Sequence, residues 1–167
     1  MDDKKARIAE KRRLIDAIRE ALTTERVESA RLAKDAANAA THEEARSEGD
    51  KDTRATEASY IARGQAERVH VIDQTLLQLG GLECRAFGSE DRIAITAVID
   101  VEQEPKTARY FLLPSGGGMK LTFEGEPITT LATSSPLGRA LIGLTEGEEA
   151  EVQSPQGLKI HAILKVR

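Results

Sequence analysis

The sequence predicts a two-domain α+β protein, with a helical hairpin over residues 1–80 and a small sheet with one short helix over residues 81–167. The first observation behind this prediction is the position of the helix breakers. All 5 prolines lie beyond residue 104, and of the 13 glycines only Gly49 and Gly64 precede Gly80. Because proline and glycine are disfavoured inside helices, the first half can be almost entirely helical and the second cannot.

The second observation is a seven-residue repeat of apolar and small residues in the first half. It runs through Ile8, Ile15, Leu22, Ser29 and Ala36, with Ile18, Leu32 and Ala39 offset by three, and then, in alternating steps of four and three, through Ala58, Ala62, Gln65, Val69, Ile72, Leu76 and Leu79. This spacing is typical of a coiled coil. One interruption, "EGDKDTR", separates the two runs. The pattern therefore predicts an antiparallel coiled-coil hairpin with its tip at residues 48–53.

The residues around that tip indicate how the chain turns and what the tip presents. Gly49 can end the first helix in a left-handed conformation, and Asp50 or Asp52 can cap the second. The apolar residues change from leucine and isoleucine to alanine toward the tip, which predicts a thin end, with Tyr60 half-buried between the helices. At the other end, the basic residues of segment 4–14 are expected to extend past the hairpin's base.

Acidic side chains are concentrated at this turn: Glu43, Glu44, Glu48, Asp50 and Asp52. Carboxylate oxygens are the ligands that Mg²⁺ prefers, and one or two of them are enough when other groups complete the shell. The alternative is an ordinary solvated turn. Charge repulsion within the cluster is a cost that a purely structural turn would avoid with asparagine or serine.

The second half reads as short strands separated by turns. Alternating or β-branched runs occupy 92–101, 108–114, 119–123, 127–132, 151–154 and 158–166. One helix, "SPLGRALIG" (135–143), has Ser135 as its N-cap, Pro136 at its first position and Gly143 after its end. These elements predict an antiparallel sheet with one short amphipathic helix.

Composition excludes several classes of function. The net charge of −4 argues against a general nucleic-acid coat, and 3% aromatics with no Trp argue against base stacking as the main activity. The single cysteine, Cys84, excludes an internal disulfide and a zinc knuckle. The charged start is neither a signal peptide nor a membrane anchor. We expect a soluble, cytoplasmic protein without a membrane partner.

Three motifs, in order, carry a resemblance to a known family: "EASYIARGQAERV", "SPLGRALIG" and "EGEEAEVQSPQG". With the Gly-Asp turn, they make the chain resemble the bacterial Gre transcript-cleavage factors, as a divergent Gre-like member. The resemblance implies an FKBP-like C-terminal domain and binding to RNA polymerase through its secondary channel. It also implies that tip carboxylates help to hold the polymerase's second catalytic Mg²⁺ while backtracked RNA is hydrolysed. The chain would then be no enzyme and hold no cofactor of its own.

Carried onto this sequence, the resemblance assigns the working carboxylates to Asp50 and Asp52, ahead of Glu48 and Glu57. Nine residues separate Asp50 from Tyr60, three more than in the family's usual pattern. The resemblance suggests as RNA-facing candidates, toward the nascent 3′ end, Arg46, Arg54 and Arg63. It suggests as polymerase-docking candidates Ser135, Pro136 and Arg139.

Other functions stay open at this point. A channel-binding inhibitor without cleavage activity would dock in the same way. An FKBP-like prolyl isomerase would need an aromatic pocket, for which the second half offers only Phe87, Tyr110, Phe111 and Phe123. A coiled-coil adaptor would not depend on its tip carboxylates. The sequence leaves open DNA contact, the oligomeric state and the role of the basic N-terminal segment.

Overall fold

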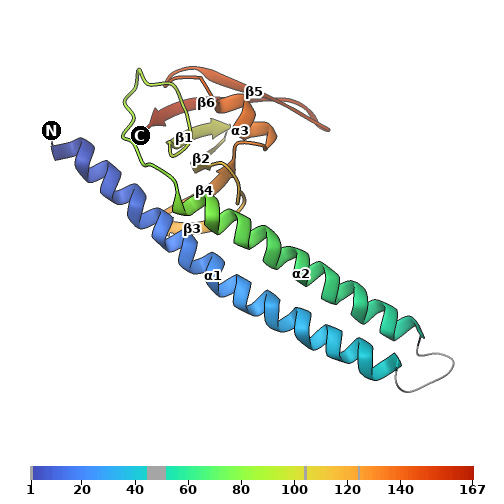
Figure 1. Cartoon of the computed structure of the whole chain (residues 1–167). Coiled ribbons are helices and arrows are strands. Elements are labelled where there is room, and N and C mark those ends of the chain that lie inside the picture. Colours follow the sequence, from blue (N-terminus) through green and yellow to red (C-terminus); the bar gives the residue numbers. More distant parts are fainter. Residues whose placement is uncertain (1, 45–51, 104, 124) are drawn as a thin grey trace. The chain divides into compact units, whose positions relative to one another are not determined.

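The computed structural model describes residues 2–44, 52–103, 105–123 and 125–167 (Figure 1). The chain divides into two compact units, one of Asp16–Gly80 and one of Met1–Ile15 with Gly81–Arg167. Helix α1 (Asp2–Glu44) contributes to both units, and α2 is Asp52–Gly80. The remaining elements are β1 (Val98–Gln103), β2 (Lys106–Leu113), β3 (Lys120–Phe123), β4 (Glu126–Ala132), α3 (Pro136–Leu141), β5 (Glu149–Ser154) and β6 (Gly157–Val166).

The unit of residues 16–80 is an antiparallel helical hairpin. Two ion pairs link α1 to α2, Glu25 with Arg68 at 2.6 Å and Arg26 with Asp73. Among the predicted heptad positions, the buried side chains in this unit are Ile18, Leu22, Ser29, Ile72 and Leu79. Ala40 and Thr75 are buried one position away from the predicted Ala39 and Leu76, and Leu32 is 38% exposed. The predicted register is therefore confirmed near the base of the hairpin and shifts by one residue elsewhere.

Side chains in the hairpin interface become smaller toward the end where α1 stops and α2 starts. Leu22, Ile72 and Leu79 are buried near the base, whereas Ala40 and Ala55 are the buried side chains toward the other end of the described hairpin. The predicted change in residue size is confirmed. The expectation for Tyr60 was wrong, because its side chain is 68% exposed and the interface positions beside it belong to alanines.

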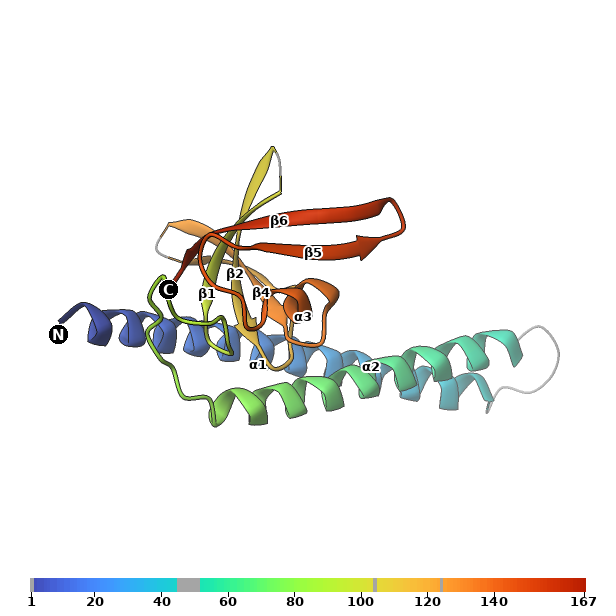
Figure 2. The same cartoon turned by 90° about the horizontal axis from the view of Figure 1, so that it is seen from above.

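The second unit holds a six-stranded sheet in the order β3-β4-β2-β1-β6-β5 (Figure 2). Four of its strand pairs are antiparallel, as predicted, but β2 and β4 pair in parallel. The predicted strand over 92–101 is also shortened to a start at Val98. Residues before it form turns, and Thr96 has a φ of 70° in the left-handed region.

Helix α3 covers one face of this sheet and packs against β4 and β5. Ten side chains share this core, among them Phe87, Ile99, Leu112, Leu141 and Ile163, each at most 2% exposed. The core also contains Leu131 from β4 at 8% exposure. α3, β4 and the loop before β1 are therefore held together by apolar burial.

The first turns of α1 belong to this unit and do not simply extend past the hairpin as a basic overhang. Lys11 is 2% exposed, and its Nζ donates to the carbonyl oxygens of Arg85 and Arg167, both at 2.7 Å. Arg7 Nη1 donates to the carbonyl of Phe87 at 3.1 Å. The Lys11 Nζ also lies 4.5 Å from the centroid of the Phe87 ring, a cation–π contact.

Candidate functional site

The predicted acidic tip lies largely outside the described residues. Helix α1 ends at Glu44 and α2 begins at Asp52, so Arg46, Glu48 and Asp50 fall in the connection between them. Asp52 is the first residue of α2, but its side chain lies outside the described residues. The assignment of Asp50 and Asp52 as working carboxylates stays a prediction.

Three of the other candidates are exposed on the first turns of α2: Arg54, Glu57 and Arg63. Residues three apart on a helix are neighbours, so Arg54 and Glu57 share a face. Asp52 and Glu57 are five residues apart, which separates them by about 140° around the helix axis at about 100° per residue. Which of Asp52 and Glu57 would act with Asp50 stays a prediction.

The structure brings the three predicted docking residues together at the start of α3. The Ser135 Oγ accepts a hydrogen bond from the Gly138 N–H at 3.0 Å and donates to the Ala132 carbonyl at 2.8 Å. Ser135 is thus the predicted N-cap, with Pro136 at the start of the helix. Pro136 and Arg139 are exposed, and Arg139 donates to the Ser134 carbonyl. Pro136 and Arg139 are available to a partner, whereas the Ser135 hydroxyl is occupied by capping.

Gly138 explains the close fit of this helix to the strand before it. A Cβ at position 138 would lie 2.1 Å from the Ala132 carbonyl oxygen, far inside contact distance. Only glycine lets α3 start directly after β4 at this separation. The "SPLG" motif therefore fixes where the exposed Pro136 and Arg139 stand.

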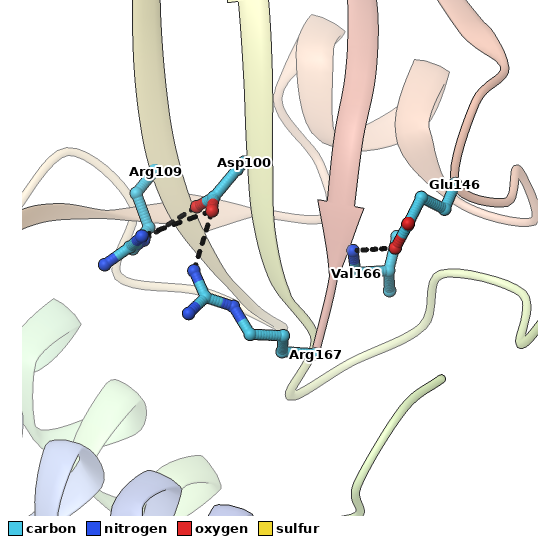
Figure 3. A network of polar contacts seen from close by, with 5 residues as sticks. All are labelled: Asp100, Arg109, Glu146, Val166 and Arg167. Atoms are coloured by element: carbon cyan, nitrogen blue, oxygen red, sulfur yellow. Dashed lines mark hydrogen bonds and ion pairs between the residues drawn. The ribbon is translucent and has the colours of Figure 1, made fainter. Parts of the chain in front are cut away.

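A network that sequence reasoning missed joins β1, β2 and the residue that follows β6 (Figure 3). The Asp100 carboxylate accepts from Arg109 Nε at 2.7 Å and from Arg167 Nη2 at 2.7 Å. Asp100 and Arg109 are directly opposed on β1 and β2. Opposite charges on the two neighbouring strands could have indicated the pair of Asp100 and Arg109. No sequence feature near Arg167 indicated that it joins them. The Glu146 carboxylate, in turn, accepts from the Val166 N–H at 3.0 Å.

Lys11 is the other polar group that the sequence did not single out. Burial lowers its pKa to about 7. The Cys84 side chain raises the pKa of Lys11, whereas the nearby cations lower it further, namely Arg7, Arg85 and Arg167. Lys11 is therefore a desolvated ammonium that two carbonyls and one aromatic ring hold in place.

No catalytic centre is apparent in the described ranges. Within them, no three or more His, Cys, Asp or Glu side chains are grouped as a metal site would require. Phe87 and Phe111 are at most 1% exposed and belong to the packed interior, so they do not line an open pocket. Across the same residues, none of the helices is apolar over a length that could traverse a bilayer.

Comparison with known proteins identifies the second half of the chain. Residues 88–167 match the family described as "Transcription elongation factor, GreA/GreB, C-term". The GreA of Hyphomonas neptunium is 33% identical over 99 residues, 59% of this chain and 54% of that protein. The GreA of Syntrophobacter fumaroxidans is 50% identical over 38 residues, 23% of this chain and 24% of that protein. The chain thus aligns with about a quarter to about half of these two relatives.

A longer match and one solved structure complete the comparison. The GreA of Nitratidesulfovibrio vulgaris is 28% identical over 130 residues, 74% of this chain and 75% of that protein. The crystal structure of GreA factor homolog 1 (Gfh1) of Thermus thermophilus is 16% identical and matches 89% of this chain and 94% of that one, with a TM-score of 0.38. The family match covers the whole sheet from β1 to β6, including the "SPLG" helix and the hairpin at Pro155. Residues 88–167 therefore match the C-terminal domain of the GreA/GreB transcription elongation factors, and the similarity to GreA extends beyond that domain over 130 residues.

Proposed function

We propose that this protein binds bacterial RNA polymerase by inserting its helical hairpin into the secondary channel and stimulates cleavage of backtracked RNA. The carboxylates of Asp50 and Asp52 would help to hold the second catalytic Mg²⁺ of the polymerase. The protein itself would have no enzymatic activity. The observation that carries the proposal is that Asp50 falls in the short connection between α1 and α2 and that Asp52 is the first residue of α2.

The hairpin geometry supports insertion into a narrow passage. Helix α2 has 29 residues, which corresponds to about 43 Å at about 1.5 Å per residue. Small side chains let two helices approach closely, and alanines occupy the buried interface positions Ala40 and Ala55. The hairpin is thus long, and its interface side chains are small toward the proposed leading end, as insertion into a narrow channel would require.

The chemistry of the carboxylates fits the proposed ion. Mg²⁺ prefers oxygen ligands in octahedral geometry and is commonly held by one or two carboxylates together with waters and phosphate oxygens. When bound, a second Mg²⁺ provides a Lewis acid for phosphodiester hydrolysis. The contribution of this chain is two negative charges on a rigid support, and the remaining ligands would come from the polymerase and the RNA.

A cleavage assay on stalled, backtracked elongation complexes tests this proposal. The full chain should accelerate Mg²⁺-dependent release of RNA 3′ fragments, and Asp50→Ala/Asp52→Ala should lose most of that acceleration while still binding polymerase. Removing ligands that act on the transition state costs on the order of 100-fold or more in rate. The control is Glu20→Ala/Glu67→Ala, which removes two exposed carboxylates elsewhere on the hairpin and so changes the net charge by the same amount. This control should stimulate cleavage as wild type does.

A channel-binding inhibitor is the second candidate, and one observation favours it. The nine residues between Asp50 and Tyr60 make the returning segment three residues longer than the family's usual pattern. A displaced carboxylate pair would occupy the channel without holding the ion productively. In that case the same assay shows tight binding with suppressed cleavage, and the double alanine variant does not alter the cleavage rate.

A further inference from the structure

The outer face of the β5–β6 hairpin carries an exposed apolar stripe. Leu158 is 53% exposed and Ile160 47% exposed, and they occupy alternate positions of β6. Alternate residues of a strand point to the same face. Leu164, 46% exposed, continues the stripe at a bulge, where the pairing of β6 with β1 shifts by one residue between Ile163 and Lys165.

Three carboxylates lie beside this stripe on the same face. Glu151 is directly opposite Ile160, and both Glu149 on β5 and Glu102 on β1 are directly opposite Ala162. Directly opposed residues of antiparallel strands share a face. Within the described part of the chain, Glu102, Glu149 and Glu151 form none of the ion pairs or side-chain hydrogen bonds seen elsewhere in this unit. Their charges are therefore available to a partner.

This face is not the one that α3 covers. Ala150 and Ile163 belong to the core under α3, and they alternate along their strands with the acidic and apolar residues of the outer face. Lys159 is opposite Val152 and so lies on the α3 side of the sheet. The outer face beside Ile160 and Ala162 is therefore acidic, whereas Lys165, Arg109 and Arg167 gather around Asp100 at its other end.

A cavity of about 240 Å³ adjoins the stripe. Leu164 lines it together with Asp100, Thr107, Arg109 and Glu126. Asp100 binds both Arg109 and Arg167 at 2.7 Å, so this triad has one carboxylate for two guanidinium groups. The cavity therefore marks the end of the acidic part of the face and offers no additional site for a cation.

We propose that this outer face, formed by Leu158, Ile160, Leu164, Glu102, Glu149 and Glu151, is a second polymerase-docking surface that binds a basic amphipathic segment of that enzyme. Apolar side chains of the segment pack on Leu158 and Ile160, and its lysines or arginines face the three glutamates. The choice of partner rests on the function proposed above. The choice of segment rests on charge complementarity and on exposed apolar area.

The test measures binding of the full chain to purified core RNA polymerase by biolayer interferometry at two salt concentrations. Glu149→Lys/Glu151→Lys should weaken binding on the order of tenfold and reduce its salt dependence. Glu83→Lys/Glu90→Lys changes the net charge equally at two exposed glutamates outside the strands and should bind like wild type. Ile160→Thr keeps a β-branched residue in the strand and should weaken binding by roughly fivefold through lost apolar area.

The outcomes separate this inference from the proposed function. If wild type binds and the Glu149→Lys/Glu151→Lys and Ile160→Thr variants bind equally well, with unchanged circular dichroism, the second surface does not exist and the channel proposal stands. A control pair that weakens binding as much as Glu149→Lys/Glu151→Lys also overturns the inference, because the effect is then one of net charge. Absence of wild-type binding to polymerase overturns both.

Discussion

Replacing Lys11 by methionine tests whether a desolvated ammonium joins the start of α1 to the sheet unit. Lys11 is 2% exposed and donates to the carbonyls of Arg85 and Arg167. Methionine has a similar length and keeps the apolar packing of the stem. The substitution therefore removes the charge and the two hydrogen bonds, while Arg167 O still accepts from the Val98 N–H at 2.9 Å.

The expected magnitude follows from proton linkage. The pKa of Lys11 is about 7 in the folded chain against 10.5 for the unfolded reference. Between these values the unfolded chain binds more protons than the native one, so stability rises with pH. The gain is complete above pH 10.5 and is lost as the pH falls toward 7. For these pKa values, the contribution of Lys11 to the free energy of unfolding rises by about 2 kcal/mol between pH 7 and pH 9.

The assay is urea denaturation at pH 7 and pH 9, followed by tyrosine fluorescence. The chain has two tyrosines and no tryptophan, so a Tyr60→Phe background leaves Tyr110 of the sheet unit as the only reporter. Lys11→Met should lose about 2 kcal/mol of stability relative to wild type on going from pH 7 to pH 9. Lys5→Met, at an exposed lysine of the same helix, should show no such change. If the free energy of unfolding of wild type and of Lys11→Met changed equally between pH 7 and pH 9, the conclusion that Lys11 is a desolvated ammonium would be refuted.

Substitutions at three further positions test the sheet unit in the same denaturation assay. Burial, and then the charge of Lys159, lowers the pKa of His161 below its usual 6.5. The native state therefore loses stability as the pH falls below 6.5. His161→Leu should remove that loss. At Thr96, where φ is 70°, glycine should be more stable than alanine by about 1 kcal/mol, the reverse of their usual order. Gly138→Ala should cost about 2 kcal/mol, because its Cβ meets the Ala132 carbonyl. The His161 argument would be contradicted if the stability of wild type did not fall below pH 6.5. The Thr96 argument would be contradicted if Thr96→Ala were at least as stable as Thr96→Gly. The Gly138 argument would be contradicted if Gly138→Ala kept the urea midpoint of wild type.

The features that the sequence predicts well are those with a local cause. The heptad positions Leu22, Ser29 and Ile72 are buried as expected, since a repeat of apolar and small residues fixes which face of a helix is covered. The short helix starts at Pro136 with Ser135 as its cap, because the capping hydroxyl and the proline act within one turn.

The features that the sequence missed depend on contacts between distant residues. The parallel pairing of β2 with β4 has no local signal, because either direction of pairing suits the same alternation of side chains. Residues 92–97 alternate like a strand, yet Ile93 and Ala97 are buried in turns and Thr96 adopts a left-handed conformation. Lys11 looked like one of several solvated basic residues until its partners, more than seventy positions away, were known.

The candidate site divides in the same way. Pro136 and Arg139 are exposed at one end of α3, as a docking role requires, because the local motif determines their position. The acidic face beside Ile160 could not be found from the sequence, since it depends on which strand residues are directly opposed. The placement of Asp50 against a metal ion depends on a partner and stays a prediction.

The most direct test of the central claim, that the hairpin end reaches the polymerase active centre, is site-specific crosslinking in a backtracked elongation complex. A photoreactive group on Lys51→Cys, in a Cys84→Ser background, should crosslink to the 3′-terminal nucleotides of the RNA. The same group on Leu77→Cys, an 81% exposed position, stands about 38 Å from the start of α2 at about 1.5 Å per residue and should not crosslink to RNA. Crosslinks from position 51 that map only to the outer surface of the polymerase, with none to RNA, would contradict the account.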